Sequence, residues 1–233
     1  MTQEEQHIIE VFLNKADPKI AKHNQKFFKQ GEDSYCKNDL LLGIPMPVIK
    51  DFVTNTPTLQ LETIANLIKS EFNEVRVLGW ALLFRDYHDT YTIKIFVKDY
   101  SQYCGNWNVV DFAAPLASKI LMKQEGHKST ESVAYDLLYR EINLWTHRFA
   151  LIMSLPLVKE SHLNYAVDVT ERSLEFEDEM IQKACGAILR EVGKQNRNIL
   201  KVFFKENHKK ISSIVQNIAL ELHTQEEKNE LYR

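Results

Sequence analysis

The 233-residue chain has few of the residues that mark β-structure, disulfides or metal sites. It contains only seven glycines, no Asn-Gly or Asp-Gly dipeptide and no sustained alternation of apolar and polar residues, so β-hairpins and half-buried strands are not expected. Its three cysteines, Cys36, Cys104 and Cys185, are far apart and form no CxxC motif. This pattern supports neither a disulfide framework nor a zinc site, and we expect reduced, mostly buried thiols.

Membrane segments and common cofactor motifs are also lacking. No run of about 18 uncharged apolar residues occurs, and residues 1–5 are acidic where a signal peptide would be basic and then apolar. We therefore expect a cytoplasmic protein with no membrane partner. The motifs GxGxxG, GxxxxGKS/T, HExxH and GxSxG are absent, so we expect neither a nucleotide cofactor nor a metal.

What the chain does have is enough apolar residues for a large core and an uneven charge. With 44% hydrophobic residues, we predict one domain over residues 1–233. The net charge of −3 weakens the case for a polyanionic partner without excluding it, because local fields matter more than totals. Residues 183–210 hold eight basic side chains against two acidic ones, so a phosphate-binding surface would lie there.

Five residues of the types that cap helices recur at one fixed interval of 35 positions. Side chains of Asn, Asp and Ser accept hydrogen bonds from the free N–H groups of a helix's first turn, and each of these five precedes an apolar run. The interval therefore predicts a structural repeat of two helices and two short turns. We call these five positions the ladder residues: Asn73, Asn108, Asn143, Asp178 and Ser213.

The repeat predicts an all-α fold, a HEAT-like solenoid of antiparallel helix pairs with a concave inner face. Prolines and acidic residues interrupt helix signals between Gly31 and Pro47. From there on, one helix is expected to begin after each ladder residue. The other expected helices lie near residues 47–54, 59–69, 90–103, 129–140, 161–174 and 196–207.

Asp111 and Trp107 flank the second ladder residue. If Asn108 caps its helix, Asp111 is the third helical residue, where the helix dipole favours an ionised carboxylate suited to stabilising a developing cation. The alternative is an Asp that only steadies its helix. Trp107 either packs onto Phe112 as a hydrophobic staple or offers an aromatic face to a sugar or base.

Basic residues follow in the next two repeats. Arg148 lies five residues after Asn143. At this position we expect it to form either a salt bridge between repeats or a phosphate contact. Four further residues, spaced by seven, four and three, predict one helical stripe that either is solvated or binds a nucleic-acid backbone. We call them the basic stripe: Lys183, Arg190, Lys194 and Arg197.

Several of these segments together resemble a known family. Leu-Gly-Ile-Pro-Met-Pro at 42–47, Trp-Asn-Val-Val-Asp at 107–111, Leu-Trp-Thr-His-Arg at 144–148 and the helix Ile-Gln-Lys-Ala-Cys-Gly-Ala-Ile-Leu-Arg-Glu at 181–191 are similar, in order and spacing, to the AlkD family of bacterial DNA alkylation repair glycosylases. The resemblance runs from about residue 5 to 220. It implies a helical-repeat monomer that holds duplex DNA and hydrolyses the glycosidic bond of cationic N3- and N7-alkylpurines.

The resemblance assigns roles to three residues and exposes two departures. It implies that Asp111 is catalytic, that Trp107 packs against the damaged nucleotide and that Arg148 contacts the DNA backbone. Where family members carry a second Trp, this chain has Ala187, and its acidic segment from Gly31 to Asp39 does not follow the family's N-terminal pattern. Three interpretations follow: a working glycosylase, a divergent paralogue with weak DNA binding and little or no excision, and a protein-binding HEAT scaffold.

Overall fold

The computed structural model describes residues 2–28, 35–37, 39–140 and 143–231. Every regular element among them is a helix, apart from one isolated bridge between Leu40 and Phe72. The predicted all-α fold is therefore confirmed. Within the described part of the chain, no helix is both long and apolar enough to cross a membrane. The acidic residues Glu32 and Asp33 lie outside the described residues.

The chain divides into two compact units, Met1–Ala113 and Ala114–Arg233. The division falls inside helix α7 (Trp107–Glu125), next to Pro115. Because proline has no N–H, Pro115 cannot donate to the carbonyl of Asp111 four residues earlier, and the helix has one hydrogen bond fewer there. The single domain over residues 1–233 and the concave face stay predictions.

The first unit contains the N-terminal helices and a group of helices in which α3 and α4 pack against α5. Helix α5 is buried on all sides, including Trp80, Leu82 and Leu83, and it packs against α4 and α3. Its elements before α7 are α1 (Gln3–Leu13), α2 (Pro18–Asn24), the 3-10 turn η1 (Gln25–Phe27), α3 (Met46–Asn55), α4 (Leu61–Ile68), α5 (Asn73–Asp86), α6 (Thr90–Tyr100) and the 3-10 turn η2 (Ser101–Tyr103).

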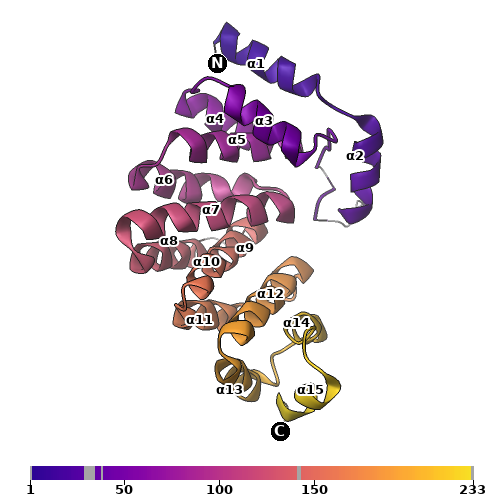
Figure 1. Cartoon of the computed structure of the whole chain (residues 1–233), viewed down its shortest axis with the longest axis vertical. Helices are drawn as coiled ribbons and strands as arrows, with labels where there is room; N and C mark the ends of the chain where they lie inside the picture. The colour runs from indigo at the N-terminus through magenta and orange to yellow at the C-terminus, as the bar shows by residue number, and fades with distance from the viewer. Residues whose placement is uncertain (1, 29–34, 38, 141–142, 232–233) are drawn as a thin grey trace. The chain divides into compact units, whose positions relative to one another are not determined.

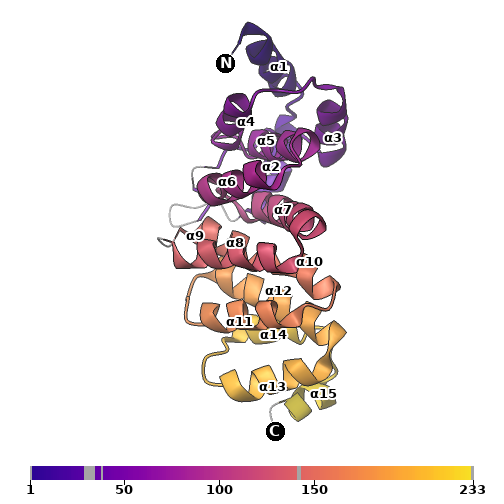
Figure 2. The same ribbon diagram turned by 90° about the vertical axis from the view of Figure 1, so that its left-hand side faces the viewer.

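The second unit contains two rows of helices, seen in both Figure 1 and Figure 2. Helices α9, α12 and α14 pack side by side, and α8, α11 and α13 pack against that row. Gly186 lets α12 approach α14, because a Cβ there would lie 2.8 Å from Ile218 Cβ. The elements after α7 are α8 (His127–Tyr139), α9 (Leu144–Ile152), α10 (Ser154–Lys159), α11 (Leu163–Ser173), α12 (Glu179–Gln195), α13 (Arg197–Asn207), α14 (Ser213–Ala219) and α15 (Gln225–Leu231).

Candidate nucleic-acid interface

The ladder residues mark helix starts to within one residue, but only two of them cap as predicted. The Asn143 side chain accepts hydrogen bonds from the N–H groups of Trp145 and Thr146, and Asp178 accepts one from Met180. Ser213 is the first residue of α14, and its neighbour Ser212 provides the cap. The 35-residue interval therefore locates the helices correctly, whereas the predicted cap is displaced by one residue at Ser213.

In the first unit the ladder residues connect two helices instead of capping them. The side-chain amides of Asn73 and Asn108 bond each other reciprocally, with N···O distances of 3.0 and 2.8 Å, so they join the first turns of α5 and α7. Asn73 also donates to the buried carboxylate of Asp39 at 2.8 Å. The prediction that both residues cap their own helices is wrong, because their amides are used between helices.

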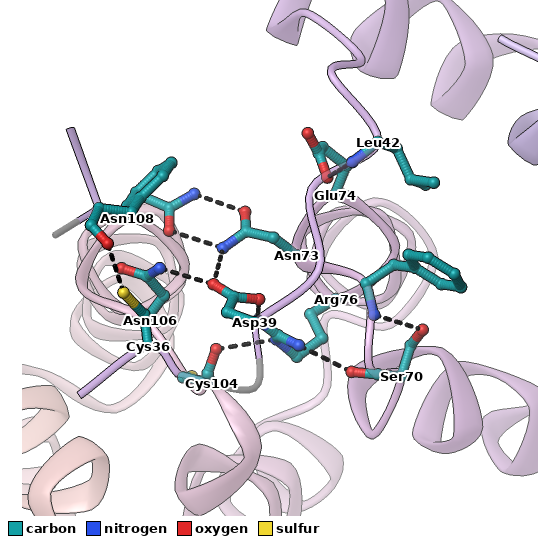
Figure 3. Close-up of polar contacts among 12 residues, drawn as sticks. Cys36, Asp39, Leu42, Ser70, Asn73, Glu74, Arg76, Cys104, Asn106 and Asn108 are labelled. Carbon is teal, nitrogen blue, oxygen red and sulfur yellow. Dashed lines mark hydrogen bonds and ion pairs between the residues drawn. The ribbon is translucent and has the colours of Figure 1, made fainter. Parts of the chain in front are cut away.

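Asp39 is the centre of a buried polar network, shown in Figure 3. Its carboxylate forms an ion pair with Arg76 and accepts hydrogen bonds from the amides of Asn73 and Asn106. Arg76 also donates to the main-chain carbonyls of Cys104 and Ser70. Since Asp39 and Arg76 are each only 5% exposed, the ion pair is buried inside the protein.

A second buried carboxylate holds the segment that follows Asp39. Glu74, 6% exposed, accepts hydrogen bonds from the N–H groups of Leu42 at 2.9 Å and Gly43 at 2.8 Å. Gly43 has a φ of +74°, and a Cβ there would lie 2.2 Å from the carbonyl oxygen of Asp17. Only glycine fits this position, which explains the glycine in the Leu-Gly-Ile-Pro segment.

Trp107 is the first residue of α7 and packs against the N-terminal helices. Its half-buried ring lies 5.7 Å from the buried ring of Phe28, centroid to centroid, at an interplanar angle of 40°. The staple onto Phe112 and the aromatic platform for a sugar or base both stay predictions. The main-chain N–H of Trp107 donates to the side-chain oxygen of Asn106, the residue just before the helix.

Asp111 is exposed and stands one helical turn after Trp107, on the same face of α7. The helix begins at Trp107, so Asp111 is its fifth residue and not the third. The prediction of a position in the first turn is wrong, because Asn108 pairs with Asn73 instead of capping the helix. Asp111 is still near the helix N-terminus, but the dipole acts on it less strongly than predicted.

Arg148 is buried within the second unit, at 6% exposure. Its guanidinium donates to the main-chain carbonyl of Met180 at 2.5 Å and thereby joins α9 to the first turn of α12. The phosphate contact suggested for it stays a prediction. The observed geometry supports a role in holding two neighbouring helices together.

The basic stripe is paired with carboxylates along its whole length. Lys183 pairs with Glu179 at 2.8 Å and Lys194 with Glu191 at 2.7 Å, each within α12. Arg190 pairs with Glu221 at 2.5 Å and with Glu191 at 3.3 Å, while Arg197 pairs with Glu227 at 2.9 Å. The stripe is also shorter than predicted: α12 ends at Gln195, and Arg197 begins α13 after the capping residue Asn196.

Ala187 lines an open cavity of about 270 Å³ in the second unit. Its lining combines two prolines and Leu155 with the ion-paired Arg190 and Glu191 and with two exposed lysines, Lys119 and Lys159. Neither lysine has an ion-pair partner among the described residues. A larger side chain at Ala187 would extend into this space.

The buried titratable groups do not form a second reactive centre. Burial raises the pKa of the Cys104 and Cys185 thiols to about 12, so both stay protonated and unreactive at neutral pH. Burial lowers the pKa of His147 to about 4, and its Nε2 lies 2.8 Å from the Ser173 hydroxyl. Among the residues that the structure describes, no cluster of three or more His, Cys, Asp or Glu side chains is arranged to hold a metal ion.

Sequence reasoning missed the residues that position the start of α7. In the sequence, Asp39 stands out only as one of several acidic residues, and Glu74, Arg76 and Asn106 belong to no motif. One signal was available: apolar residues occur around the whole of α5, and a charged residue inside such a helix has to be paired. Arg76 also stands one repeat before Asp111, so the interval itself indicated an equivalent place for it.

Helix pairs that begin within one residue of positions spaced by 35 define the class of this molecule, an α-helical repeat protein. The sequence profile of the family described as DNA alkylation repair enzyme matches residues 8–222, and the chain belongs to that family. No match is found among curated protein sequences.

Solved structures show the same fold at low sequence identity. A structure described as a predicted DNA alkylation repair enzyme from Enterococcus faecalis is 18% identical, covers 91% of this chain and 98% of its own, and has a TM-score of 0.68. AlkD2 from Streptococcus mutans is 20% identical over 87% of this chain and 96% of its own, with a TM-score of 0.56. The smu.31 protein from Streptococcus mutans UA159 is 19% identical over 96% and 98%, also at 0.56.

Proposed function

We propose that this DNA alkylation repair protein binds duplex DNA and hydrolyses the N-glycosidic bond of cationic N3- and N7-alkylpurines, with Asp111 as the catalytic residue. One observation carries the proposal. Asp111 is exposed on the same face of α7 as the half-buried ring of Trp107, one turn away. A carboxylate and an aromatic surface are thus offered side by side to one ligand.

The chemistry matches these two groups. In an alkylated purine that already carries a positive charge, the bond from C1′ to the base breaks with its electron pair moving to the base, which leaves neutral. The sugar passes through an oxocarbenium-like state, which an anion stabilises. Water then bonds to C1′ and gives a proton to the carboxylate of Asp111 or to solvent. No general acid and no cofactor is needed for these steps.

Trp107 serves as the surface against which the damaged nucleotide lies. Phe28 packs against its ring, and the Trp107 side chain is only half-buried. Stacking of a base on an aromatic side chain contributes about 1 to 3 kcal/mol and tolerates any base. Arg148 has a structural part in this scheme, because its guanidinium is buried and engaged by the carbonyl of Met180.

A second candidate function, a divergent paralogue that binds DNA weakly and excises little or nothing, is favoured by two other observations. Every member of the basic stripe already has a carboxylate partner. Ala187 leaves an open cavity where the family resemblance places a second aromatic wall. Both features lower the affinity for a polyanion carrying a damaged base. The third candidate, a protein scaffold, is supported by the fold alone.

The experiment is a base-excision assay on methylated duplex DNA with the wild type, Asp111→Asn and Asp51→Asn. Asp51 is the matched control, an exposed helical aspartate on α3 in the same unit. We expect excision to fall by roughly 100- to 1000-fold in Asp111→Asn, the order seen when an electrostatic stabiliser is removed, and to be kept in Asp51→Asn. Excision that survives Asp111→Asn would contradict the catalytic role of Asp111.

Two further variants separate the candidates. Ala187→Trp restores an aromatic side chain at the cavity. Glu191→Gln removes the carboxylate that Arg190 and Lys194 share, which leaves Lys194 without its ion pair while Arg190 keeps Glu221. No excision by the wild type, together with DNA binding that weakens as salt rises and tightens in Glu191→Gln, selects the divergent paralogue. No binding of DNA even at low salt selects the protein scaffold.

A further inference from the structure

Two buried carboxylates hold the segment 39–43 onto α5, and they differ in one respect. Glu74 binds only that segment, through the N–H groups of Leu42 and Gly43. Asp39 binds Arg76 and Asn73 of α5, and it also accepts a hydrogen bond at 2.6 Å from Asn106, the residue just before α7. Figure 3 shows Asp39 with the Asn73 and Asn106 amides on one side and Arg76 on the other.

The contact with Asn106 continues directly to Trp107. While the amide nitrogen of Asn106 donates to Asp39, its side-chain oxygen accepts the main-chain N–H of Trp107 at 2.8 Å. A second connection runs in parallel, because Asn73 bonds both Asp39 and Asn108. Residues on both sides of Trp107 are thus tied to one buried carboxylate. These hydrogen bonds restrict rotation and sliding of the first turn of α7.

The ring of Trp107 is also supported from the N-terminal side. Phe28 lies against the indole, and the buried Cys36 donates its thiol to the carbonyl oxygen of Phe28. Trp107 therefore stands between a hydrophobic support and a main chain that the Asp39 network holds. Its orientation depends on both, and only the network is charged.

We propose that Asp39 is a positioning residue for Trp107 and Asp111, acting through Asn106 and Asn73. This inference rests on the proposed function, in which Trp107 and Asp111 face the damaged nucleotide. It adds that the direction in which α7 presents them is set by a carboxylate outside the helix. A buried ion pair with hydrogen bonds to several partners is suited to this, because it specifies one arrangement.

The test compares Asp39→Asn with Glu74→Gln. Both changes remove one buried charge that holds the segment 39–43, but only Asp39 contacts Asn106. In Asp39→Asn an amide group has to face Arg76 or the amide donors of Asn73 and Asn106, so one of these contacts is lost. Glu74→Gln is therefore the matched control for loss of stability without loss of the link to α7.

The first readout is the fluorescence of Trp107. Trp80 and Trp145 are only 0% and 7% exposed, so quenching by acrylamide reports mainly on the half-buried Trp107. We expect a higher quenching constant and a red-shifted emission in Asp39→Asn, and wild-type values in Glu74→Gln. Combining each change with Trp107→Phe should abolish the difference. Equal quenching in the two variants would overturn the proposal.

The second readout is the single-turnover excision rate with the DNA dissociation constant measured in parallel. Asp39→Asn should lower the rate by up to about 100-fold, the order expected when reacting groups are misplaced by about 1 Å, with little change in binding. Glu74→Gln should keep the wild-type rate. If the wild type excises nothing, the proposed function fails, yet the fluorescence result still decides whether Asp39 positions Trp107.

A third variant covers the case in which Asp39→Asn does not fold. Asn106→Ala removes the link between Asp39 and Trp107 and leaves the ion pair of Asp39 with Arg76 in place. It should raise the quenching of Trp107 as Asp39→Asn does. Quenching that stays at the wild-type value in Asn106→Ala would also overturn the proposal.

Discussion

The two units use equivalent positions of the repeat in different ways. In the first unit, Asn73 and Asn108 bond each other between helices and share the buried acceptor Asp39. In the second unit, Asn143 and Asp178 turn back onto the first turns of their own helices. A cap stabilises one helix end, whereas an amide pair fixes two helices relative to each other. Equal spacing in a repeat therefore does not imply equal function.

The second unit joins its neighbouring helices by other residues. Arg148 binds the carbonyl of Met180, and Gln182 accepts a hydrogen bond from Ser212. These contacts end on a main-chain carbonyl or a neutral amide, and neither contains a buried ion pair. The contacts between helices of the first unit thus include a buried ion pair that these two contacts of the second unit lack. They lie around the start of α7, the helix that carries Trp107 and Asp111.

The largest expected effect comes from breaking the ion pair of the first unit. Asp39→Ala leaves the buried guanidinium of Arg76 without its carboxylate, and removing one partner of a buried pair costs about 3 to 5 kcal/mol of unfolding free energy. Urea denaturation followed by circular dichroism measures the loss. Hydrogen exchange should locate it in α5 and the first turn of α7.

The matched control is Glu175→Ala, which removes an exposed ion pair with Lys210 in the second unit. Exposed pairs contribute little, so this variant should unfold at the wild-type urea concentration. A stability loss in Asp39→Ala no greater than that in Glu175→Ala would remove the proposed difference between the units.

A second prediction concerns acid, which should act on the second unit through His147. Burial lowers its pKa to about 4 from about 6.5 in the unfolded chain, so the unfolded state binds the extra proton between these values. Stability is fully present above about pH 6.5 and is lost as the pH falls toward 4, by about 3 kcal/mol.

The measurement is hydrogen exchange in α9 and α11 across this pH range, corrected for intrinsic exchange. His147→Gln removes the imidazole and should flatten the pH dependence while keeping a polar group near Ser173. A dependence on pH that persists unchanged in His147→Gln would assign the acid sensitivity to another group.

The sequence predicted the architecture well because caps and apolar runs are local signals. Asp17 caps α2 ahead of Pro18, and each ladder residue lies within one position of a helix start. The use of the side chains could not be predicted in the same way. Whether Asn108 caps its helix or bonds Asn73 depends on a neighbour 35 residues away in sequence. A local sequence pattern carries no information about such a distant contact.

The candidate site was predicted in part for the same reason. Trp107 and Asp111 were identified from a motif, and their spacing alone places them on one face of α7. The residues that support them were not identified. Asp39 lies between Gly31 and Pro47, where the signals indicate only a break in helix structure, and no local pattern links Phe28 to Trp107. The basic stripe was counted without its partners, and Glu221 and Glu227 lie about 30 residues beyond the cations that they neutralise.

A third prediction tests the amide pair between α5 and α7. Asn108→Ala leaves the side-chain oxygen of Asn73 without its donor, at a cost of about 1 to 3 kcal/mol for an unsatisfied buried group. A double-mutant cycle of Asn73→Ala and Asn108→Ala should show a coupling energy of at least about 0.5 kcal/mol. The pair Asn108→Ala with Asn143→Ala should show none, and a coupling there of similar size would contradict the separation of the two roles.

The smallest effect is expected from the caps of the second unit. Asn143→Ala removes the acceptor for the N–H groups of Trp145 and Thr146 and should cost about 1 kcal/mol, the usual value of such a cap. Asn143→Asp keeps an acceptor at the same place and should restore the wild-type unfolding free energy. Because a cap acts only on its own helix, faster hydrogen exchange should be confined to the first turn of α9. If exchange instead rises equally in α12, Asn143 also connects helices, and the two units use the repeat position alike.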